Sequence, residues 1–368
     1  MIFIYLKFMR KKYNISVIGA GNGGQAIAGY CAMRGYHVCL YNRNIEHIKT
    51  IQQTRTITLC GQIQGTGKID IVTNDIKVAV EYADIIMITT TANAHKDLAF
   101  QMSSHLKQGQ IIILNPGRTG GLLEFKTILQ KQNLNKTVYL AETQTLIYAC
   151  RIIKEGFVNI IGIKTRVPLA SNNRLNTQYI IDQLSDLYTC FLPAKNVLQI
   201  GFENIGAIFH PCIILFNTAT IERGESFYFY RDMTDRVANF IQKTDTERVT
   251  LGKTYEVELM NAIEWISYAY SGIKGNTLCE KMKNNPAYND ILAPASIYSR
   301  QLLEDIPMGI VPCIELAKVA GMEMPLFQSI LNICSELLDI DFLSEGRTLD
   351  KLGLEGLSVN EIITLVNY

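Results

Sequence analysis

The chain has 368 residues, which is longer than one hydrophobic core usually extends, so two domains are expected. Hydrophobic residues make up 48% of the chain and charged residues 19%, a composition typical of a soluble globular enzyme. The net charge of +1 gives no basic excess that would indicate a nucleic-acid partner.

The start of the chain and the cysteines bear on cellular location. Residues 1–9 are mostly apolar, but the stretch is short and the basic residues 10–12 follow it, which argues against a signal peptide. No apolar run reaches the roughly 18 residues of a membrane span, so no membrane partner is expected. The nine cysteines form no CxxC pair and no cluster with histidine, so neither disulfides nor a metal site is indicated. We predict a cytoplasmic enzyme with reduced thiols.

The first half of the chain alternates short apolar strands with helical segments. The expected strands are Ile15–Ile18, His37–Tyr41, Ile85–Thr89, Ile111–Leu114 and Val138–Leu140, and the first expected helix is Ala26–Met33. Such alternation indicates a parallel sheet with helices on both faces. We therefore predict an α/β Rossmann domain over residues 12–198.

The pattern changes beyond about residue 165. A last α/β piece is expected at 177–189, followed by a connector around 193–201. Longer segments with helical spacing of apolar residues follow at 204–221, 234–242 and 257–270. We predict an all-α second domain over residues 199–368, and we interpret the acidic stretch 232–248 as solvated helix faces.

A glycine-rich turn directly follows the first strand. Gly19, Gly21 and Gly24 fit the spacing GxGxxG, and the last glycine opens a helix. In such a turn the first glycine permits the tight bend, the second lets backbone approach a pyrophosphate, and the third allows close packing of helix on strand. Helix amide groups then face the phosphates. We predict a dinucleotide site formed by these glycines and Asn22.

The end of the second strand bears on the choice of cofactor. An Asp or Glu there would bind the ribose 2′-hydroxyl of NAD. This chain has Asn42 and Arg43 instead, and a guanidinium can pair with a 2′-phosphate. We therefore favour NADP(H) over NAD(H). In the alternative interpretation, Arg43 is a solvated residue that stacks loosely on adenine.

Several further segments are more selective than the glycine turn. They are 115–121, 141–146 and 148–151 in the first half, and 204–211, 227–228, 245–248, 300–307 and 309–312 in the second. On these segments the chain resembles the octopine/nopaline-type opine dehydrogenases over nearly its whole length. Met308 departs from the family pattern, in which an aromatic residue more often precedes the glycine found here at position 309.

The resemblance implies a Rossmann domain followed by a helical domain, and an NAD(P)H-dependent oxidoreductase acting on CH–NH groups. Such enzymes condense an amino acid with a 2-oxo acid such as pyruvate and reduce the imine to an opine. The partners expected are therefore these small-molecule substrates, and a homodimer is compatible with the sequence. The resemblance does not identify the substrate pair or indicate whether the product binds metal.

His210 is the one histidine of the second half and lies in an apolar run, in a helix that Pro211 should kink or restart. Imidazole suits proton transfer at neutral pH, yet from the residues alone a core histidine is the favoured interpretation. The resemblance favours catalysis, with Asp305 as the partner that fixes the imidazole. It also implies that Arg300 clamps the substrate carboxylate. The alternative for Arg300 is an exposed helical ion pair with Glu304.

Three further points stay open. Glu142 and Gln144 are expected after a strand, where they either touch the nicotinamide or hold the loop. A reductase of 2-oxo or 3-oxo acids on the same two-domain plan is an alternative, and dependence of turnover on an amine separates it from an opine dehydrogenase. A dinucleotide sensor without chemistry is a third interpretation, against which stand His210, Asp305 and Arg300.

Overall fold

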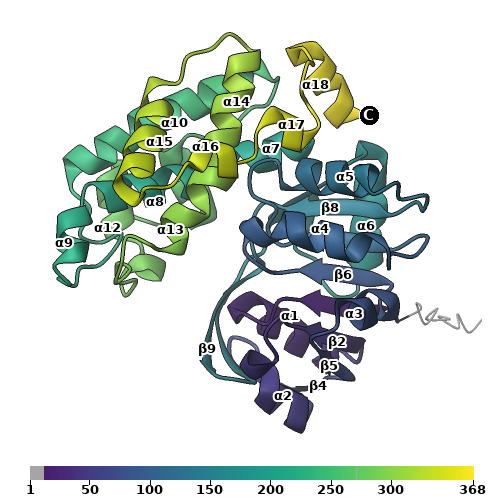
Figure 1. Ribbon diagram of the computed structural model, residues 1–368. Helices are drawn as coiled ribbons and strands as arrows, with labels where there is room; N and C mark the ends of the chain where they lie inside the picture. Colours follow the sequence, from purple (N-terminus) through teal and green to yellow (C-terminus); the bar gives the residue numbers. More distant parts are fainter. Residues whose placement is uncertain (1–11, 271) are drawn as a thin grey trace, which may run out of the picture.

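The computed structural model describes residues 12–270 and 272–368, so the apolar start at 1–9 lies outside the described residues. Figure 1 shows an α/β part followed by a helical part, as predicted. The large sheet has eight strands. In spatial order they are β12 (Phe191–Pro193), β11 (Val167–Ser171), β8 (Tyr139–Thr143), β7 (Ile111–Leu114), β6 (Ile85–Ile88), β1 (Asn14–Ile18), β2 (His37–Tyr41) and β5 (Ile71–Thr73).

The central strands are continuous apolar runs because helices cover both of their faces. Every residue of β6 and β7 is buried. The sheet is mostly parallel, but β8 and β11 pair antiparallel. The predicted parallel sheet is therefore interrupted at this one pairing of strands. The reason is the connection, which runs through a hairpin of two further strands instead of a crossover helix.

Helices α3 (Ile76–Tyr82), α4 (His95–Ser103) and α5 (Gly121–Lys131) contribute to one hydrophobic core, which is continuous with that of the helical part. Helix α1 (Asn22–Met33) and helix α6 (Arg174–Leu184) contribute to the second core. Helix α1 begins four residues before the expected start at Ala26, directly in the glycine turn.

A second sheet of four strands was not predicted. In spatial order it contains β4 (Gly65–Lys68), β3 (Thr56–Gly61), β10 (Phe157–Ile163) and β9 (Tyr148–Lys154). It packs closely on α1, because a Cβ added at Gly67 would lie 2.4 Å from the carbonyl oxygen of Gly29. The alternating burial along β3 is the period-two signal by which the sequence could have revealed this sheet.

The helical part is built around the long helix α10. Its members are α7 (Val197–Phe202), α8 (Gly206–Leu215), α9 (Thr218–Glu222), α10 (Asp235–Thr254), α11 (Ala262–Ala269), α12 (Leu278–Lys283), α13 (Arg300–Leu303), α14 (Val311–Val319), α15 (Pro325–Leu338) and α16 (Phe342–Glu345). The last helices, α17 (Leu349–Leu352) and α18 (Val359–Asn367), lie beside the α/β part, and α17 packs against α5 (Figure 1).

Two expectations for this half need correction. The connector at 193–201 contains most of helix α7. The stretch 232–248 is not uniformly solvated, since Asp245 and Arg248 are each only 2% exposed and form an ion pair of 2.7 Å. The physical reason is that α10 packs on five other helices, and Arg248 also donates to the carbonyl of Phe202.

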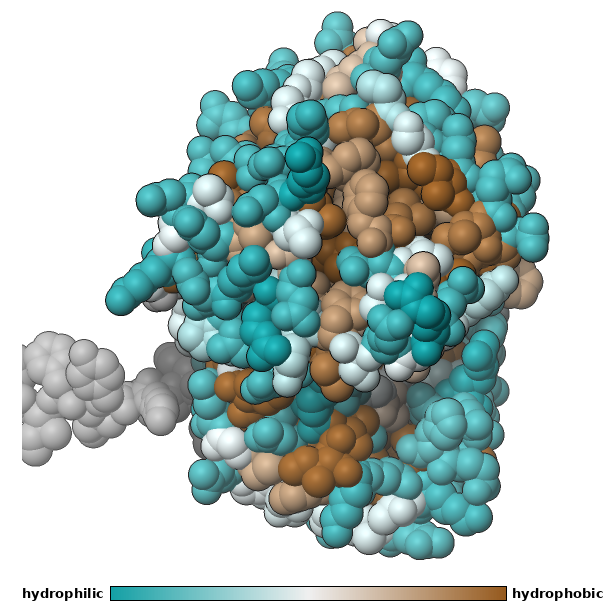
Figure 2. Space-filling model, turned by 90° about the vertical axis from the view of Figure 1, so that its left-hand side faces the viewer, coloured by the Kyte–Doolittle hydropathy of each residue, from teal (hydrophilic) through white to brown (hydrophobic). Residues whose placement is uncertain are grey.

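One segment, Val197–Leu215, is long and apolar enough to cross a membrane by composition, but 78% of its most apolar window is buried in the protein. It comprises α7 and α8, which belong to the core of the helical part. Figure 2 shows hydrophobic side chains on one face gathered in two areas separated by polar residues.

Candidate active site

The glycine turn has the geometry expected of a dinucleotide site. Gly19 has φ +104°, a conformation that L side chains rarely adopt. A Cβ at Gly24 would lie 1.7 Å from the carbonyl oxygen of Gly19, so only glycine allows this helix to pack on the strand. A Cβ at Gly21 would meet open space, on the side where backbone can approach a pyrophosphate. These residues therefore fit a bound dinucleotide.

The flanking residues of the turn are placed next to it. Asn42 accepts a hydrogen bond from the amide of Ala20, at 3.2 Å, which joins the end of β2 to the turn. The side chain of Arg43, the residue after Asn42 at the end of β2, is exposed. Asn22 starts α1, and its side chain accepts from the amide of Ile152 in β9, at 2.7 Å. Asn22 thus links the turn to the second sheet.

His210 and Asp305 are brought together from positions 95 residues apart. The Nδ1 atom of His210 lies 2.6 Å from a carboxylate oxygen of Asp305, and Nε2 lies 2.9 Å from the hydroxyl of Tyr230. The His210 side chain is 15% exposed and that of Asp305 is 1% exposed. Helix α8 continues through Pro211, so the expected restart of the helix is wrong.

Asp305 lies at the entrance of a π-helical turn, η4 (Ile306–Ile310), a type of turn found frequently at functional sites. Burial raises the pKa of Asp305, but the charges of His210 and Arg118 outweigh burial and hold that pKa below its ordinary value. Asp305 is therefore an ionised acceptor, so the hydrogen on the imidazole lies at Nδ1.

Arg300 does form the ion pair with Glu304, at 2.5 Å, but the pair is not an ordinary surface contact. Arg300 is 49% exposed, whereas Glu304 is only 4% exposed. Glu304 also pairs with Arg118, at 3.3 Å, and accepts from the amide of Ala92, at 2.8 Å. Because Ala92 and Arg118 belong to the α/β part, Glu304 joins the two parts of the chain beside the candidate site.

Arg118 was missed as a site residue, although it lies in the segment 115–121, on which the family resemblance partly rests. It donates to the side chain of Asn204, at 3.1 Å. Burial alone would lower the pKa of Arg118, but the carboxylates of Asp305 and Glu304 raise it, so Arg118 keeps its charge. Its partners lie 86 and 186 residues away in the sequence, so no local pattern reveals them.

Glu142 lies within strand β8 and not after it. It is fully buried and accepts from the amide of Leu122 at the start of α5, at 3.0 Å. A Cβ at Gly117 would lie 1.8 Å from the same carboxylate oxygen. Of the two roles expected for Glu142, holding the loop is the one that these contacts provide.

Arg347 was also missed. Its side chain is fully buried and pairs with Glu124 of α5, at 2.8 Å. It donates to the carbonyls of Gly117 and Thr119, at 2.9 and 3.0 Å. Arg347 follows α16 of the helical part, so it is a second connection between the two parts at the same loop.

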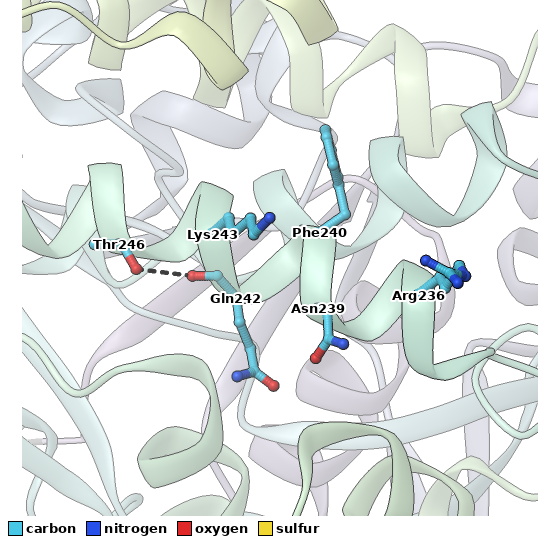
Figure 3. A pocket seen from close by; sticks show the side chains of 6 residues that line it. All are labelled: Arg236, Asn239, Phe240, Gln242, Lys243 and Thr246. Atoms are coloured by element: carbon cyan, nitrogen blue, oxygen red, sulfur yellow. Dashed lines mark hydrogen bonds between the residues drawn. The ribbon is translucent and has the colours of Figure 1, made fainter.

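A surface depression of about 540 Å³ runs along α10 and is separate from these residues (Figure 3). The side chains that line it splay to different sides of the helix and do not converge on one point. A small-molecule site usually needs convergent polar groups, so we assign none here. The lining residues are Arg236, Asn239, Phe240, Gln242, Lys243 and Thr246.

Within 12–270 and 272–368 no group of three His, Cys, Asp or Glu side chains could hold a metal ion.

The dinucleotide turn lies at the carboxyl end of β1 in a mostly parallel sheet, and the histidine–aspartate pair lies in a helical second domain. Together they define a two-domain, dinucleotide-dependent dehydrogenase. Comparison with known proteins is consistent with this class. The chain matches the family model described as NAD/NADP octopine/nopaline dehydrogenase, alpha-helical domain, over residues 193–338. It also matches the N-terminus model of NAD-dependent glycerol-3-phosphate dehydrogenase over residues 14–139.

An opine dehydrogenase of Arthrobacter sp. (strain 1C) is 35% identical, with 95% of this chain and 98% of that protein covered. A structure of octopine dehydrogenase with NADH and agmatine has a TM-score of 0.81 at 20% identity, covering 96% and 98% of the chains. An NADP⁺-bound yersinopine dehydrogenase has a TM-score of 0.73 at 16% identity, covering 96% and 97%. The chain belongs to the octopine/nopaline dehydrogenase family and is an NAD(P)-dependent oxidoreductase acting on CH–NH donors.

Proposed function

We propose that this opine dehydrogenase condenses an amino acid with a 2-oxo acid such as pyruvate, and that His210 is its acid–base group. The observation that carries the proposal is the 2.6 Å contact between His210 and the buried, ionised Asp305. Solved relatives are described as octopine dehydrogenase with NADH and L-arginine, and with NADH and pyruvate, which supports this class of substrate.

The role of Asp305 follows from its position. Its carboxylate accepts the Nδ1 hydrogen and so fixes the tautomer and the orientation of the imidazole. It also stabilises the imidazolium that forms when Nε2 is protonated. Asp305 is a positioning residue, because it contacts His210 and acts through it.

Arg300 is proposed to hold a substrate carboxylate. Glu304 engages its Nη1 atom, and the half-exposed guanidinium offers further N–H donors in a planar fork. Binding of amine and oxo acid in one place removes much of the entropic cost of their encounter.

NAD(P)H, when bound, supplies the hydride that reduces the imine carbon. Gly19, Gly21, Asn22 and Gly24 are proposed to hold its pyrophosphate, and Arg43 to pair with a 2′-phosphate, so that NADP(H) is preferred. The exposed side chain of Arg43 beside the turn supports this preference. Relatives with either cofactor have been solved, which is compatible with both.

The domain division and the cellular location are part of the same proposal. The predicted boundary between residues 198 and 199 falls within helix α7 (Val197–Phe202), so we propose that the helical domain begins at the start of this helix, close to residue 193, where the match to the helical family model begins. We propose a cytoplasmic enzyme, supported by nine cysteines that are all free in the structure. A homodimer stays compatible with this proposal.

His210→Asn tests the proposal, because asparagine retains a polar group near Asp305 but cannot transfer the proton. We expect kcat to fall by roughly 10²- to 10⁴-fold with the dissociation constant of NADPH unchanged. Asp305→Asn should lower kcat in the same direction. His105→Asn is the matched control, since His105 lies in the α/β part near Glu81. An unchanged steady-state rate in His210→Asn would exclude the assignment.

A further inference from the structure

Both ring nitrogens of His210 have partners within the protein. Nδ1 donates to Asp305, and Nε2 lies 2.9 Å from the hydroxyl of Tyr230. Each imidazole nitrogen has one hydrogen-bonding position in the ring plane. A substrate atom and the Tyr230 hydroxyl therefore cannot both occupy the position at Nε2. Either Tyr230 leaves when substrate binds, or its hydroxyl is the group that meets the substrate.

The ring of Tyr230 is held on several sides. It stacks on Tyr288 with centroids 4.3 Å apart, and Phe229 packs edge-on against it at 4.9 Å. The backbone is fixed as well, because the amide of Phe229 donates to the carbonyl of Ile291 at 2.7 Å. Withdrawal of the hydroxyl from His210 would require the ring to leave this stack. The packing thus favours a hydroxyl that stays at Nε2.

The surroundings keep this hydroxyl protonated at neutral pH. Burial raises the pKa of Tyr230, and the charge of Asp305 and the neighbouring Tyr270 raise it further. The positive charges of Arg300 and Arg118 act in the opposite direction but are smaller effects. Tyr230 is partly exposed, and its hydroxyl is a neutral proton donor.

We propose that the Tyr230 hydroxyl is a catalytic group that contacts the substrate and relays the proton of His210 to it. This inference rests on the proposed role of His210. Amine and 2-oxo acid first combine to a carbinolamine. Tyr230 then donates its proton to the carbinolamine hydroxyl and takes the Nε2 proton of the imidazolium. The C–O bond breaks, water leaves with its electron pair, and the nitrogen lone pair forms the iminium. The positive charge moves from His210 to the iminium, while Asp305 retains the Nδ1 hydrogen.

Tyr230→Phe tests the relay, because it removes the hydroxyl and keeps the stacked ring. We expect kcat to fall by roughly 10²-fold or more, with KM for both substrates changing much less. Tyr255→Phe is the matched control, since this buried tyrosine of the same domain donates to the carbonyl of Leu316 and does not contact the site. A kcat within about threefold of the wild type, with a lower KM, would show displacement of Tyr230 by substrate and overturn the proposal.

The outcome can be separated from that of the His210 assignment. Loss of activity in His210→Asn but not in Tyr230→Phe would leave the proposed function standing and remove only the relay. A second readout is the ¹⁵N signal of the His210 Nε2 atom, recorded with NADP⁺ and the 2-oxo acid bound. The relay predicts that wild type and Tyr230→Phe differ in this complex. Coincident signals in the complex would mean that substrate has replaced Tyr230, which contradicts the relay.

Discussion

At the scale of single residues, the site depends on buried charges whose partners lie far away in the sequence. The family resemblance pointed to His210, Asp305 and Arg300, and the structure brings the first two into contact. Tyr230 and Arg347 were not predicted. Their contacts join segments 20 and 223 residues apart, and such pairings leave no spacing pattern for a sequence to reveal.

Glu142 gives a prediction at this scale. Burial raises the pKa of Glu142 to about 8, more than the charge of Arg347 lowers it, whereas the ordinary value is 4.5. Between these pH values the folded state holds a proton that the unfolded state has released. The free energy of unfolding therefore falls as pH rises through this window, by about 1.4 kcal/mol per pH unit for this group.

Glu142→Gln should remove this slope, because glutamine resembles the neutral carboxyl and does not titrate. Urea denaturation at pH 5.5 and pH 7.5 should show the variant gaining roughly 2 to 3 kcal/mol relative to wild type over the two units. Glu336→Gln, on an exposed position of α15, is the control. Parallel pH dependence of Glu142→Gln and wild type would mean that the Glu142 carboxyl is already ionised at neutral pH.

At the scale of elements, strands that are buried on both faces were predicted well, since β2 and β7 have the expected bounds. The second sheet was missed because its strands are half-buried and distant in the sequence, and β3 pairs with β10 almost 100 residues later. Strand β8 pairs antiparallel with β11 because the connection between them runs through the hairpin of β9 and β10. Long-range strand pairing is set by packing, which local periodicity does not encode.

The glycine turn gives a prediction at the scale of the element. Gly24→Ala should destabilise the fold by about 1–3 kcal/mol, because its Cβ would overlap the carbonyl of Gly19. Gly21→Ala should melt like the wild type, since no atom lies within 4 Å of the added Cβ, yet it should bind NADPH at least about tenfold more weakly. Thermal melting and fluorescence titration measure both effects. Wild-type affinity in Gly21→Ala would place the pyrophosphate elsewhere.

At the scale of the whole molecule, the helical part reaches back to the α/β part through Glu304, Arg347 and the C-terminal helices. Glu304 accepts a hydrogen bond from Arg118, and Arg347 donates to the carbonyl of Gly117. The 117–119 loop beside His210 is therefore held from two sides. The two-part architecture was predictable from the change in periodicity. These connections were not, because each joins residues far apart in the sequence, which leaves no local pattern.

Arg347→Met tests this connection. It leaves Glu124 buried without its partner, so the free energy of unfolding should fall by about 3–5 kcal/mol. The double variant Arg347→Met/Glu124→Leu should recover part of the loss, because the unpaired charge is gone. A denaturation cycle over the four proteins measures the coupling. Purely additive effects would mean that the two side chains do not depend on each other.

The central claim is tested most directly by NADPH oxidation at neutral pH with pyruvate or 2-oxoglutarate, with and without a panel of amino acids, and repeated with NADH. We expect oxidation only when oxo acid and amine are both present, with a higher kcat/KM for NADPH, a preference that Arg43→Ala should weaken. Oxidation with the oxo acid alone, at a rate unaffected by any amine, would contradict the account and identify a hydroxy-acid-forming reductase.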